Sequence, residues 1–424
     1  MDLALLRRFA PISAILSFAL SFRLWRLDSP KGYIFDEIYY AKNAFSLISS
    51  GVELDQEGGA EFVVHPPLGK WLIGIGIKLF GNNEFGWRSS SALFGSASVL
   101  LIYLIAKRLF KSEFLALSAA LLMALDGLSL VMSRVALLDI FLMFFVLLTF
   151  YFLLKEDYWL SGLAIGLGVS TKWSAAFLIP VLLLLTLKLK ELNLSQILKR
   201  AGQFIFLPMA IYLTSWIGWF VSDKGWSRNS GSNPISSLWN YHFEILNFHT
   251  NLVEKHSYSA NPWSWLVLGR PTSFYYQSGD SCGAGECAQE ILAMGTPLLW
   301  WAGTIAIAVA IGFWLRSLIK RTSEPALNLI VLGMAAGYLP WFFFQSRTVF
   351  TFYAIVFEPF MILALVYCAK LLLDSSLKAG ISQGLVAAFV TVIFLNFVYF
   401  FPIFTGEIIT YEAWLQRMWM NSWI

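Results

Sequence analysis

Two adjacent carboxylates, Asp36 and Glu37, stand out in the segment YIFDEIYYAKNAF, because apolar stretches precede and follow them. A carboxylate held beside a reacting hydroxyl can act as a general base and remove its proton. The pair also has a structural interpretation, since an aspartate followed by EIYYAKNAFSLI is typical of a helix N-cap. The pair therefore predicts proton transfer, the start of a helix, or both.

Four cations lie near the ends of apolar stretches, namely Arg88, Arg134, Lys172 and Arg347. A charge within a spanning helix costs at least about 2.5–3.5 kcal/mol on insertion scales, so it usually has a partner or a function. Any one of them is explained by snorkelling to the interface or by an ion pair, such as Arg134 with Asp139. Together they favour a shared anion near the membrane surface, of which a lipid-linked phosphate is an example.

A carboxylate near a cationic pocket is suited to glycosyl transfer from a lipid-phosphate sugar. The pocket would hold the phosphate of a polyprenyl chain whose tail lies in the bilayer, and the acid would deprotonate the incoming nucleophile. His65 lies nearby in the sequence, in VVHPPLGKW, where two prolines predict a rigid bend. The alternative is an ordinary entry from a loop into a helix, with proline in the first turn.

The composition places these residues in a multi-pass membrane protein. Of 424 residues, 58% are hydrophobic and 13% are charged, whereas soluble domains are about 45–50% apolar and about 25% charged. This excludes a soluble enzyme. With a net charge of +4 and no strongly basic tract, nucleic acid is not an expected partner.

Apolar stretches predict about eleven spanning helices, each needing about 20 residues, within one membrane domain, 1–424. The expected spans are 9–27, 86–106, 113–131, 135–154, 158–171, 173–190, 201–221, 297–315, 326–345, 349–370 and 382–402. The segment 68–80 is too short to span and is expected at the interface. The first stretch follows Arg7 and Arg8 without a small-x-small cleavage site, which indicates an uncleaved helix.

The basic residues predict the orientation of these spans. With the N-terminus in the cytoplasm, alternation places the Lys and Arg clusters between spans on the cytoplasmic side, as the positive-inside rule requires. The C-terminus is then outside, and the two large outer loops are 28–85 and 222–296. These loops contain Asp36, Glu37 and all four histidines. A transporter is a weaker alternative, because no internal repeat is evident.

Cys282 and Cys287, in CGAGEC, fall in the second large outer loop. An oxidising exterior favours a disulfide between them. Metal binding is the alternative, although only two thiols are present and no histidine is near. Cys368 lies in a span, where packing explains it.

A series of motifs resembles the bacterial protein O-mannosyltransferases, which use dolichyl- or polyprenyl-phosphate-mannose and belong to the GT-C class. In order, these motifs are FDEIYYA, HPPLGKW, WRSSSALFG, SRVALLD, STKW, SLWNYHFEILNFHTNLVEKHSYSANPWSWL, RPTSFYY, TPLLWWAG and RTVFTFYAIVFEPF. The resemblance implies an all-α GT-C membrane fold with about eleven spans. It also implies inverting transfer of mannose to Ser or Thr hydroxyls of secreted or translocating proteins at the cell membrane.

The resemblance also implies roles for individual residues. Asp36 matches the essential acid and would be the base, while Glu37 would orient it or bind the acceptor. The residues expected to bind the donor phosphate are Arg88, Arg134, Lys172, Arg347 and Tyr353. Those expected to contact donor or acceptor are His65, Tyr39 and His242.

His256 departs from the family pattern, because HSY replaces the usual HPY. No cofactor is required by this scheme, and a divalent metal is left open. The secretion channel is a further expected partner. Another GT-C enzyme, such as a lipid A aminoarabinose transferase, is the nearest alternative, and an acceptor assay would separate the two.

Overall fold

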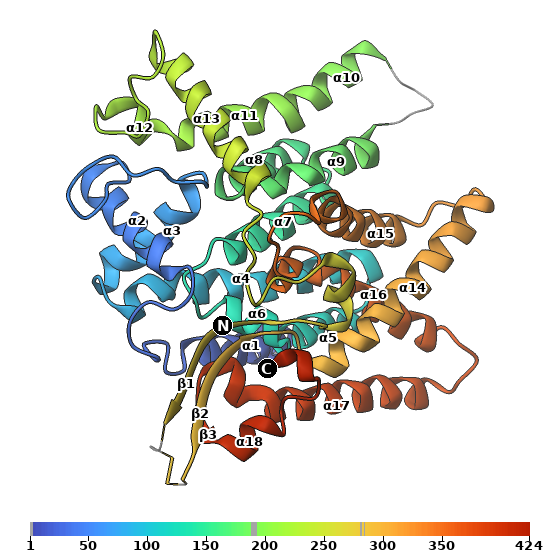
Figure 1. The fold of residues 1–424 in the computed structure, drawn as a ribbon. Coiled ribbons are helices and arrows are strands. Elements are labelled where there is room, and N and C mark those ends of the chain that lie inside the picture. The colour runs from blue at the N-terminus through green and yellow to red at the C-terminus, as the bar shows by residue number, and fades with distance from the viewer. Residues whose placement is uncertain (1–2, 188–192, 280–281, 284) are drawn as a thin grey trace.

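A computed structural model describes residues 3–187, 193–279, 282–283 and 285–424, and the chain in it is predominantly helical (Figure 1). The first half contains α1 (Leu3–Leu24), α2 (Glu37–Ser50), α3 (Leu68–Phe80), α4 (Glu84–Phe110), α5 (Glu113–Ala124), α6 (Gly127–Met132), α7 (Asp139–Leu154), α8 (Tyr158–Thr171), η1 (Trp173–Leu178), α9 (Ile179–Thr186), α10 (Leu194–Ala201), η3 (Gly202–Phe206), α11 (Leu207–Ser215) and α12 (Ile217–Val221). The second half contains α13 (Pro234–Asn251), η4 (Pro262–Val267), β1 (Thr272–Gly279), β2 (Cys287–Ala293), α14 (Pro297–Ile319), α15 (Pro325–Tyr338), η5 (Leu339–Phe344), η6 (Thr351–Val356), α16 (Glu358–Leu373), α17 (Ala379–Thr405), β3 (Ile408–Thr410), α18 (Tyr411–Leu415) and η7 (Asn421–Trp423).

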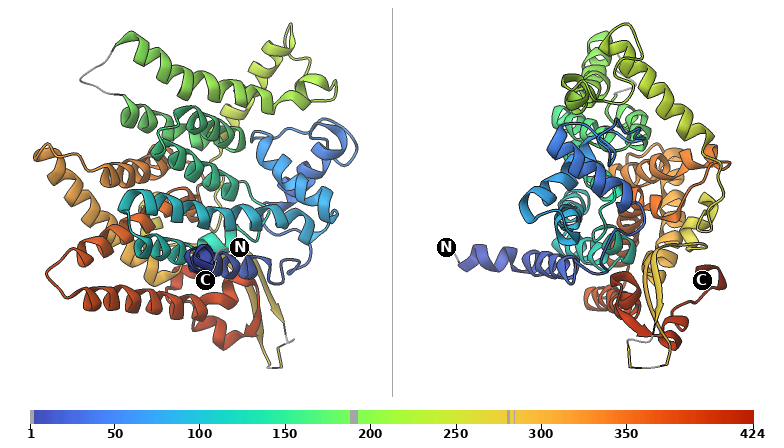
Figure 2. Two further views of the ribbon diagram at one scale, coloured as in Figure 1. Left: turned by 180° about the vertical axis from the view of Figure 1, so that it is seen from behind. Right: turned by 60° about the vertical axis from the view of Figure 1, so that its left-hand side comes forward.

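Helix α7 lies in the middle of the bundle (Figure 1). Its sequence, DIFLMFFVLLTFYFLL, has almost no polar face, and a helix of that kind is buried on all sides. It packs between α4 and α8, and the side chains of Phe141 and Phe150 are fully buried. At the edge of the bundle, the start of α1 projects sideways (Figure 2).

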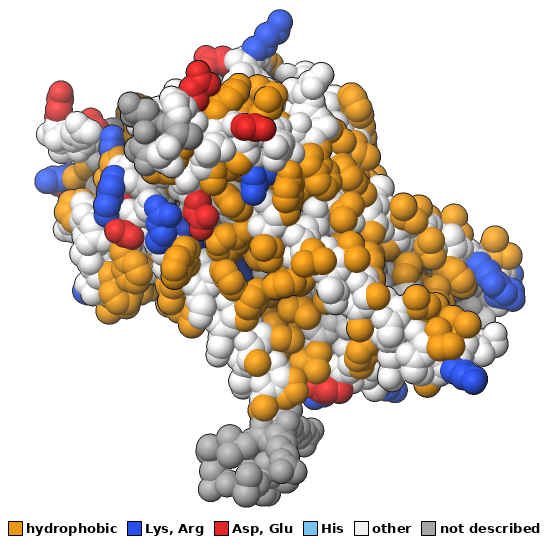
Figure 3. All heavy atoms as spheres, turned by 90° about the horizontal axis from the view of Figure 1, so that it is seen from below, with side chains coloured by type: hydrophobic (Ala, Val, Ile, Leu, Met, Phe, Trp, Pro, Cys, Tyr) orange, Lys and Arg blue, Asp and Glu red, His pale blue; other side chains and the backbone are white. Residues whose placement is uncertain are grey.

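Four helical segments of the described chain are long and apolar enough to cross a membrane: Glu84–Phe110, Pro297–Ile319, Pro325–Phe344 and Ala379–Thr405. Seen from below, hydrophobic side chains cover a broad band of the molecule (Figure 3). The interfacial helix expected at 68–80 is α3, Leu68–Phe80. Each of the eleven expected spans contains helix, although the last residues of 173–190 lie outside the described ranges.

Several expected spans are not single helices. The span 113–131 is divided at Asp126, because its carboxylate accepts a hydrogen bond from the Ser129 amide and caps α6. Its other oxygen accepts from the Thr296 amide and the Trp300 indole, so a buried carboxyl group ties α6 to the start of α14. A carboxylate with these three donors is satisfied away from water.

Three short 3₁₀ segments, η1, η5 and η6, replace regular helix in the spans expected at 173–190, 326–345 and 349–370. A 3₁₀ turn changes the direction of side chains relative to an α-helix and often marks a functional region. All three segments contribute residues to the cavities described below.

The expectation of an all-α chain is wrong in one place, where three strands form a small antiparallel sheet in the order β1–β2–β3. The strand β2 pairs with β1 beside it and with β3 near the C-terminus, where Cys287 lies opposite Thr410. Cys282 and Cys287 form the predicted disulfide near the tip of the β1–β2 hairpin. Cys368 is a half-buried free cysteine on α16.

Candidate active site

Residues far apart in the chain meet in a cavity of about 570 Å³, which we call the central cavity. The first outer loop and α2 form one wall, the junctions before α7 and after α8 form its floor, and residues after α13 and before η6 close the other side. The polar and charged residues that line it include Asp36, Tyr39, Tyr40, Asn43, Glu61, His65, Lys70, Asp139, Lys172, His249, Glu254, Lys255, His256, Arg347, Thr348 and Tyr353.

Asp36 occupies the N-cap position of α2, but its side chain makes no capping hydrogen bond and lines the central cavity instead. Burial raises the pKa of this carboxyl to about 6, with Lys172 opposing the shift and Asp139 adding to it. The carboxyl is therefore mostly ionised at neutral pH and easily protonated. These are the properties of a general base.

The backbone just before Asp36 is constrained. Phe35 has a φ of 48°, in the left-handed region that bulky residues rarely adopt. Its ring stacks on Phe274 of β1 at a centroid distance of 4.5 Å and meets Phe350 and Phe352 edge-on. This aromatic cluster fixes the turn that presents Asp36 to the cavity.

Glu37 turns the opposite way, into the protein. It is fully buried and pairs with Arg88, with two nitrogen–oxygen distances of 2.8 Å. It also accepts hydrogen bonds from the amides of Ile34 and Ala136. Glu37 therefore holds the first outer loop against the segment before α7, and it does not line the central cavity.

The predicted phosphate-binding role of Arg88 is corrected by its surroundings. Its remaining guanidinium hydrogens go to the carbonyls of Leu27, Pro30 and Gly32, so all five donors are used within the protein. Arg88 does not line the central cavity. A buried arginine with a bidentate carboxylate and three carbonyls is a structural anchor.

Arg134 is also placed away from the cavity. Its guanidinium donates to carbonyls at the end of α1, including that of Phe22 at 2.9 Å, and so satisfies groups that a helix end leaves free. The alternative pairing of Arg134 with Asp139 is not formed. Asp139 instead accepts from Lys172 at 2.8 and 3.0 Å.

Lys172 lies where α8 passes into η1, and it lines the central cavity. Its ammonium nitrogen is 4.4 Å from the ring centroid of Tyr353 on η6. Asp139 forms an ion pair with Lys172, and both residues line the central cavity together with Tyr353.

Arg347 has an incomplete set of partners. One terminal nitrogen donates to His249 Nδ1 at 3.2 Å, while its Nε is buried with no hydrogen-bond partner in the described chain. Buried polar groups are nearly always paired, so such a donor calls for a ligand. His249 Nε2 lies 2.8 Å from the Val64 carbonyl, which makes Nε2 the donor and Nδ1 the acceptor.

The two central histidines are neutral. Burial and the charge of Arg347 lower the pKa of His249 to about 4. The pKa of His65 is also well below its usual value, because the ring is buried near Lys172, His249 and Lys70. The rings lie 5.2 Å apart. They line the cavity wall without adding charge.

His242 was predicted to contact donor or acceptor, but it lies behind the wall. Its ring accepts from the Tyr212 hydroxyl at 2.7 Å, and Tyr212 in turn accepts from the Trp173 indole at 2.8 Å. The other ring nitrogen donates to the Leu238 carbonyl. His242 therefore positions Trp173, whereas Tyr39 and His256 do line the central cavity.

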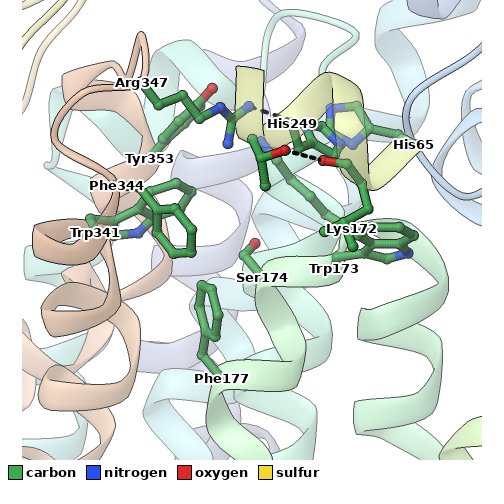
Figure 4. Close-up of a pocket in the computed structure, with 12 residues that line it drawn as sticks. His65, Lys172, Trp173, Ser174, Phe177, His249, Trp341, Phe344, Arg347 and Tyr353 are labelled. Atoms are coloured by element: carbon green, nitrogen blue, oxygen red, sulfur yellow. Dashed lines mark hydrogen bonds between the residues drawn. The ribbon is translucent and has the colours of Figure 1, made fainter. Parts of the chain in front are cut away.

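A second hollow of about 210 Å³, the apolar cavity, continues from the central one (Figure 4). Five residues line both: His65, Lys172, His249, Arg347 and Tyr353. Beyond this shared border the lining becomes aromatic, with Trp173, Phe177, Trp341 and Phe344. Figure 4 shows Arg347 and the two histidines at one end and Phe177 at the other.

Comparison with known proteins identifies the family. The profile described as "Dolichyl-phosphate-mannose-protein mannosyltransferase" matches residues 80–221, and "C-terminal four TMM region of protein-O-mannosyltransferase" matches residues 234–423. A polyprenol-phosphate-mannose–protein mannosyltransferase of Mycolicibacterium smegmatis is 31% identical over 98% of this chain and 93% of the relative. The chain belongs to the protein O-mannosyltransferase family.

Structural comparison supports the same fold. The Saccharomyces cerevisiae protein O-mannosyltransferase Pmt1–Pmt2 complex bound to the sugar donor gives a TM-score of 0.81 at 17% identity, covering 99% of this chain and 93% of that one. A Pseudomonas paraeruginosa undecaprenyl phosphate aminoarabinose transferase is 31% identical, but over only 47% of this chain and 38% of its own. Full-length sequence similarity therefore lies with the protein O-mannosyltransferases.

Some cavity residues of this protein O-mannosyltransferase were missed by sequence reasoning. Tyr40 lies one turn after Asp36 and faces the same cavity, so helical spacing within FDEIYYA was a usable signal. Asp139 was noticed only as a partner for Arg134. No local pattern indicates its pairing with Lys172, which is 33 residues away in the chain.

Proposed function

We propose that this protein transfers mannose from a polyprenyl-phosphate-mannose to Ser or Thr hydroxyls of proteins on the extracytoplasmic side of the cell membrane. The observation that carries the proposal is the arrangement of the two joined cavities. Asp36 lines the central cavity, Lys172 and Arg347 lie at its border, and an aromatic cavity continues beyond them. In this order, the three regions would accommodate the acceptor hydroxyl beside Asp36, the donor phosphate beside Lys172 and Arg347, and the lipid tail in the apolar cavity.

In this scheme the mannosyl phosphate lies across the shared border. Arg347, whose Nε has no partner in the described chain, and Lys172 face the phosphate and stabilise the negative charge that it gains on leaving. Tyr353 and the neutral ring of His65 supply further hydrogen bonds, while His249 holds Arg347 in place through its Nδ1. The first isoprene units enter the apolar cavity among Phe177, Trp341 and Phe344, in keeping with the preference of apolar chains for such walls.

Asp36 takes the hydroxyl proton of the acceptor as its oxygen attacks the anomeric carbon of mannose. The bond from that carbon to the phosphate oxygen breaks, and polyprenyl phosphate leaves as an anion that needs no proton. Attack from the side opposite the phosphate inverts the anomeric configuration. A positioned base contributes typically about 10²–10⁴-fold. The scheme uses no metal ion.

The membrane arrangement is part of the same proposal. Eleven spans, with a cytoplasmic N-terminus and an external C-terminus, place α2, α3 and α13 outside, so that the central cavity opens to the extracytoplasmic side. The basic residues at the ends of α14 and α16, such as Arg316 and Lys370, then face the cytoplasm.

The proposal is tested with the purified full-length protein in lipid vesicles and a radiolabelled polyprenyl-phosphate-mannose. We expect label in a Ser- or Thr-containing peptide and none in lipid A or a peptide that lacks both hydroxyls. Label that appears in the lipid acceptor instead would favour the aminoarabinose-type alternative and contradict the proposal.

A further inference from the structure

A third hollow, of about 910 Å³, runs along the solvent side of α2 and the loop that follows it. We call it the outer groove. It is lined by Tyr33, Ile38, Tyr39, Lys42, Phe45, Ser46, Ser49, Ser50, Leu54, Asp55, Gln56, Gly58, Glu61 and Asn82. None of these residues belongs to the shared border described above.

The outer groove continues into the central cavity. Tyr39 and Glu61 line both of them, and Tyr39 lies one helical turn after Asp36 on α2. The central cavity thus has two neighbours of opposite character. The apolar cavity joins it at Lys172 and Arg347, whereas the outer groove joins it on the side of Asp36.

The groove has a surface suited to a polypeptide. Ile38, Lys42, Phe45 and Ser49 follow one another at helical spacing along one face of α2. Ile38 and Phe45 are 44% and 45% exposed, and α2 lies outside the expected membrane spans. Contiguous exposed apolar side chains with polar neighbours are typical of a binding surface.

The walls of the groove are held in place before any ligand binds. The Ser46 hydroxyl donates to the Val52 carbonyl and accepts from the Leu54 amide, which ties the loop to α2. Farther along, Asp55 accepts from the amides of Glu57 and Gly59. A preformed site avoids the entropic cost of ordering itself on binding.

We propose that the outer groove binds the acceptor polypeptide, as an extended segment that runs from the modified hydroxyl at Asp36 along α2. This inference rests on the proposed function. From Ile38 to Ser49 the helix rises about 17 Å, which an extended chain covers in about five residues. The groove therefore contacts about five acceptor residues on one side of the hydroxyl.

The test compares a long and a short acceptor. Ser49→Trp places an indole in the far part of the groove, and Asn247→Trp on α13, which lines none of the three cavities, is the matched control. Each enzyme is assayed with an eleven-residue peptide carrying a central Ser and with a blocked single-serine acceptor. We expect Ser49→Trp to raise KM about tenfold for the long peptide and to leave the short acceptor unchanged.

An equal change for both acceptors, or no change for either, would overturn the inference. A second measurement does not depend on turnover: Phe45 is replaced by a photoreactive benzoylphenylalanine, and the long peptide is added. We expect a covalent adduct at a peptide residue beside the serine, and an adduct with lipid alone would overturn the inference. If the wild-type protein transfers no mannose to either acceptor, the proposed function is wrong. If the wild-type protein is active but Ser49→Trp does not discriminate between the two acceptors, only the inference about the outer groove is wrong.

Discussion

Asp36 and Glu37 are adjacent at the start of α2, but the charged groups around these two acids differ completely in their hydrogen bonding. Around Glu37 and Arg88 every guanidinium donor has a partner within the chain, and the carboxylate accepts four hydrogen bonds. Around Asp36 and Arg347 the carboxylate caps no helix and a guanidinium nitrogen is left over. Fully satisfied charges hold the fold, whereas incompletely satisfied charges are available to substrates.

If the charges around Asp36 are the ones available to substrates, the substitution Asp36→Asn should have the largest effect on the transfer rate. We expect transfer to fall about 10²–10⁴-fold, because the amide cannot accept the proton. The fold should be retained, since the Asp36 side chain makes no capping hydrogen bond. Initial rates and thermal unfolding of the purified variant measure both effects, and near-normal turnover would rule out Asp36 as the base.

Arg88→Met should lower the stability of the fold and should not affect the transfer reaction directly. Removing one partner of a buried ion pair costs about 3–5 kcal/mol, because Glu37 is left buried and unpaired. We expect a large loss of folded protein in detergent, seen by size-exclusion chromatography and thermal unfolding. A stable Arg88→Met protein that has lost only donor affinity would show that Arg88 binds the phosphate after all.

Arg347→Ala should weaken binding of the lipid phosphate. A hydrogen bond to a charged group is worth about 1.5–3 kcal/mol, so we expect donor affinity to fall about tenfold to a hundredfold. The KM for the peptide should stay unchanged. Lys224→Ala, at an exposed outer-loop cation that lines none of the cavities, is the control. Equal donor affinity in Arg347→Ala would contradict the assignment.

The pH dependence of the transfer activity should be a smaller effect than those of the substitutions above. The pKa of Asp36 is raised to about 6, so the base is ionised above that pH and protonated below it. Activity should therefore fall as pH decreases, reaching about a tenfold loss one unit below the pKa. His249, with a pKa of about 4, stays neutral throughout this range. A rate that is constant between pH 5 and 7 would contradict an ionisation at Asp36.

The smallest effect is expected at Tyr212, which connects Trp173 to His242. Tyr212→Phe removes this hydroxyl and should cost about 0.5–1.5 kcal/mol in unfolding free energy. Because Trp173 lines the apolar cavity, the KM for the donor should rise while the KM for the peptide is unchanged. A change confined to the peptide would contradict a positioning role for this hydrogen-bonded chain.

Much of the helical fold was predictable, because the composition of a long apolar stretch is enough to predict a helix that is buried or spans the membrane. The helix at Leu68–Phe80 has its expected ends. The sheet was missed because β2 pairs with β3, so that Cys287 meets a residue 123 positions later, and no local pattern records this pairing. The break at Asp126 depends equally on a partner far away, the start of α14.

The charged residues of the site were recognised in the sequence from their residue types. Their division into a structural group around Glu37 and a group around Asp36 that is available to substrates was not predicted. Arg88 and Arg347 both lie beside apolar stretches, and nothing local separates a guanidinium that faces five internal acceptors from one with a free nitrogen. The sequence position of Glu37 next to Asp36 was equally uninformative, because side chains one residue apart on a helix point in different directions. Only the folded arrangement shows which charges remain available.

The account is tested most directly by a structure of the protein with bound polyprenyl phosphate. We expect the phosphate at the border of the two cavities, with an oxygen about 2.9 Å from Arg347 Nε, Lys172 beside it and the isoprene units against Phe177 and Trp341. A phosphate bound at Arg88 or Arg134, or far from Asp36, would contradict the account.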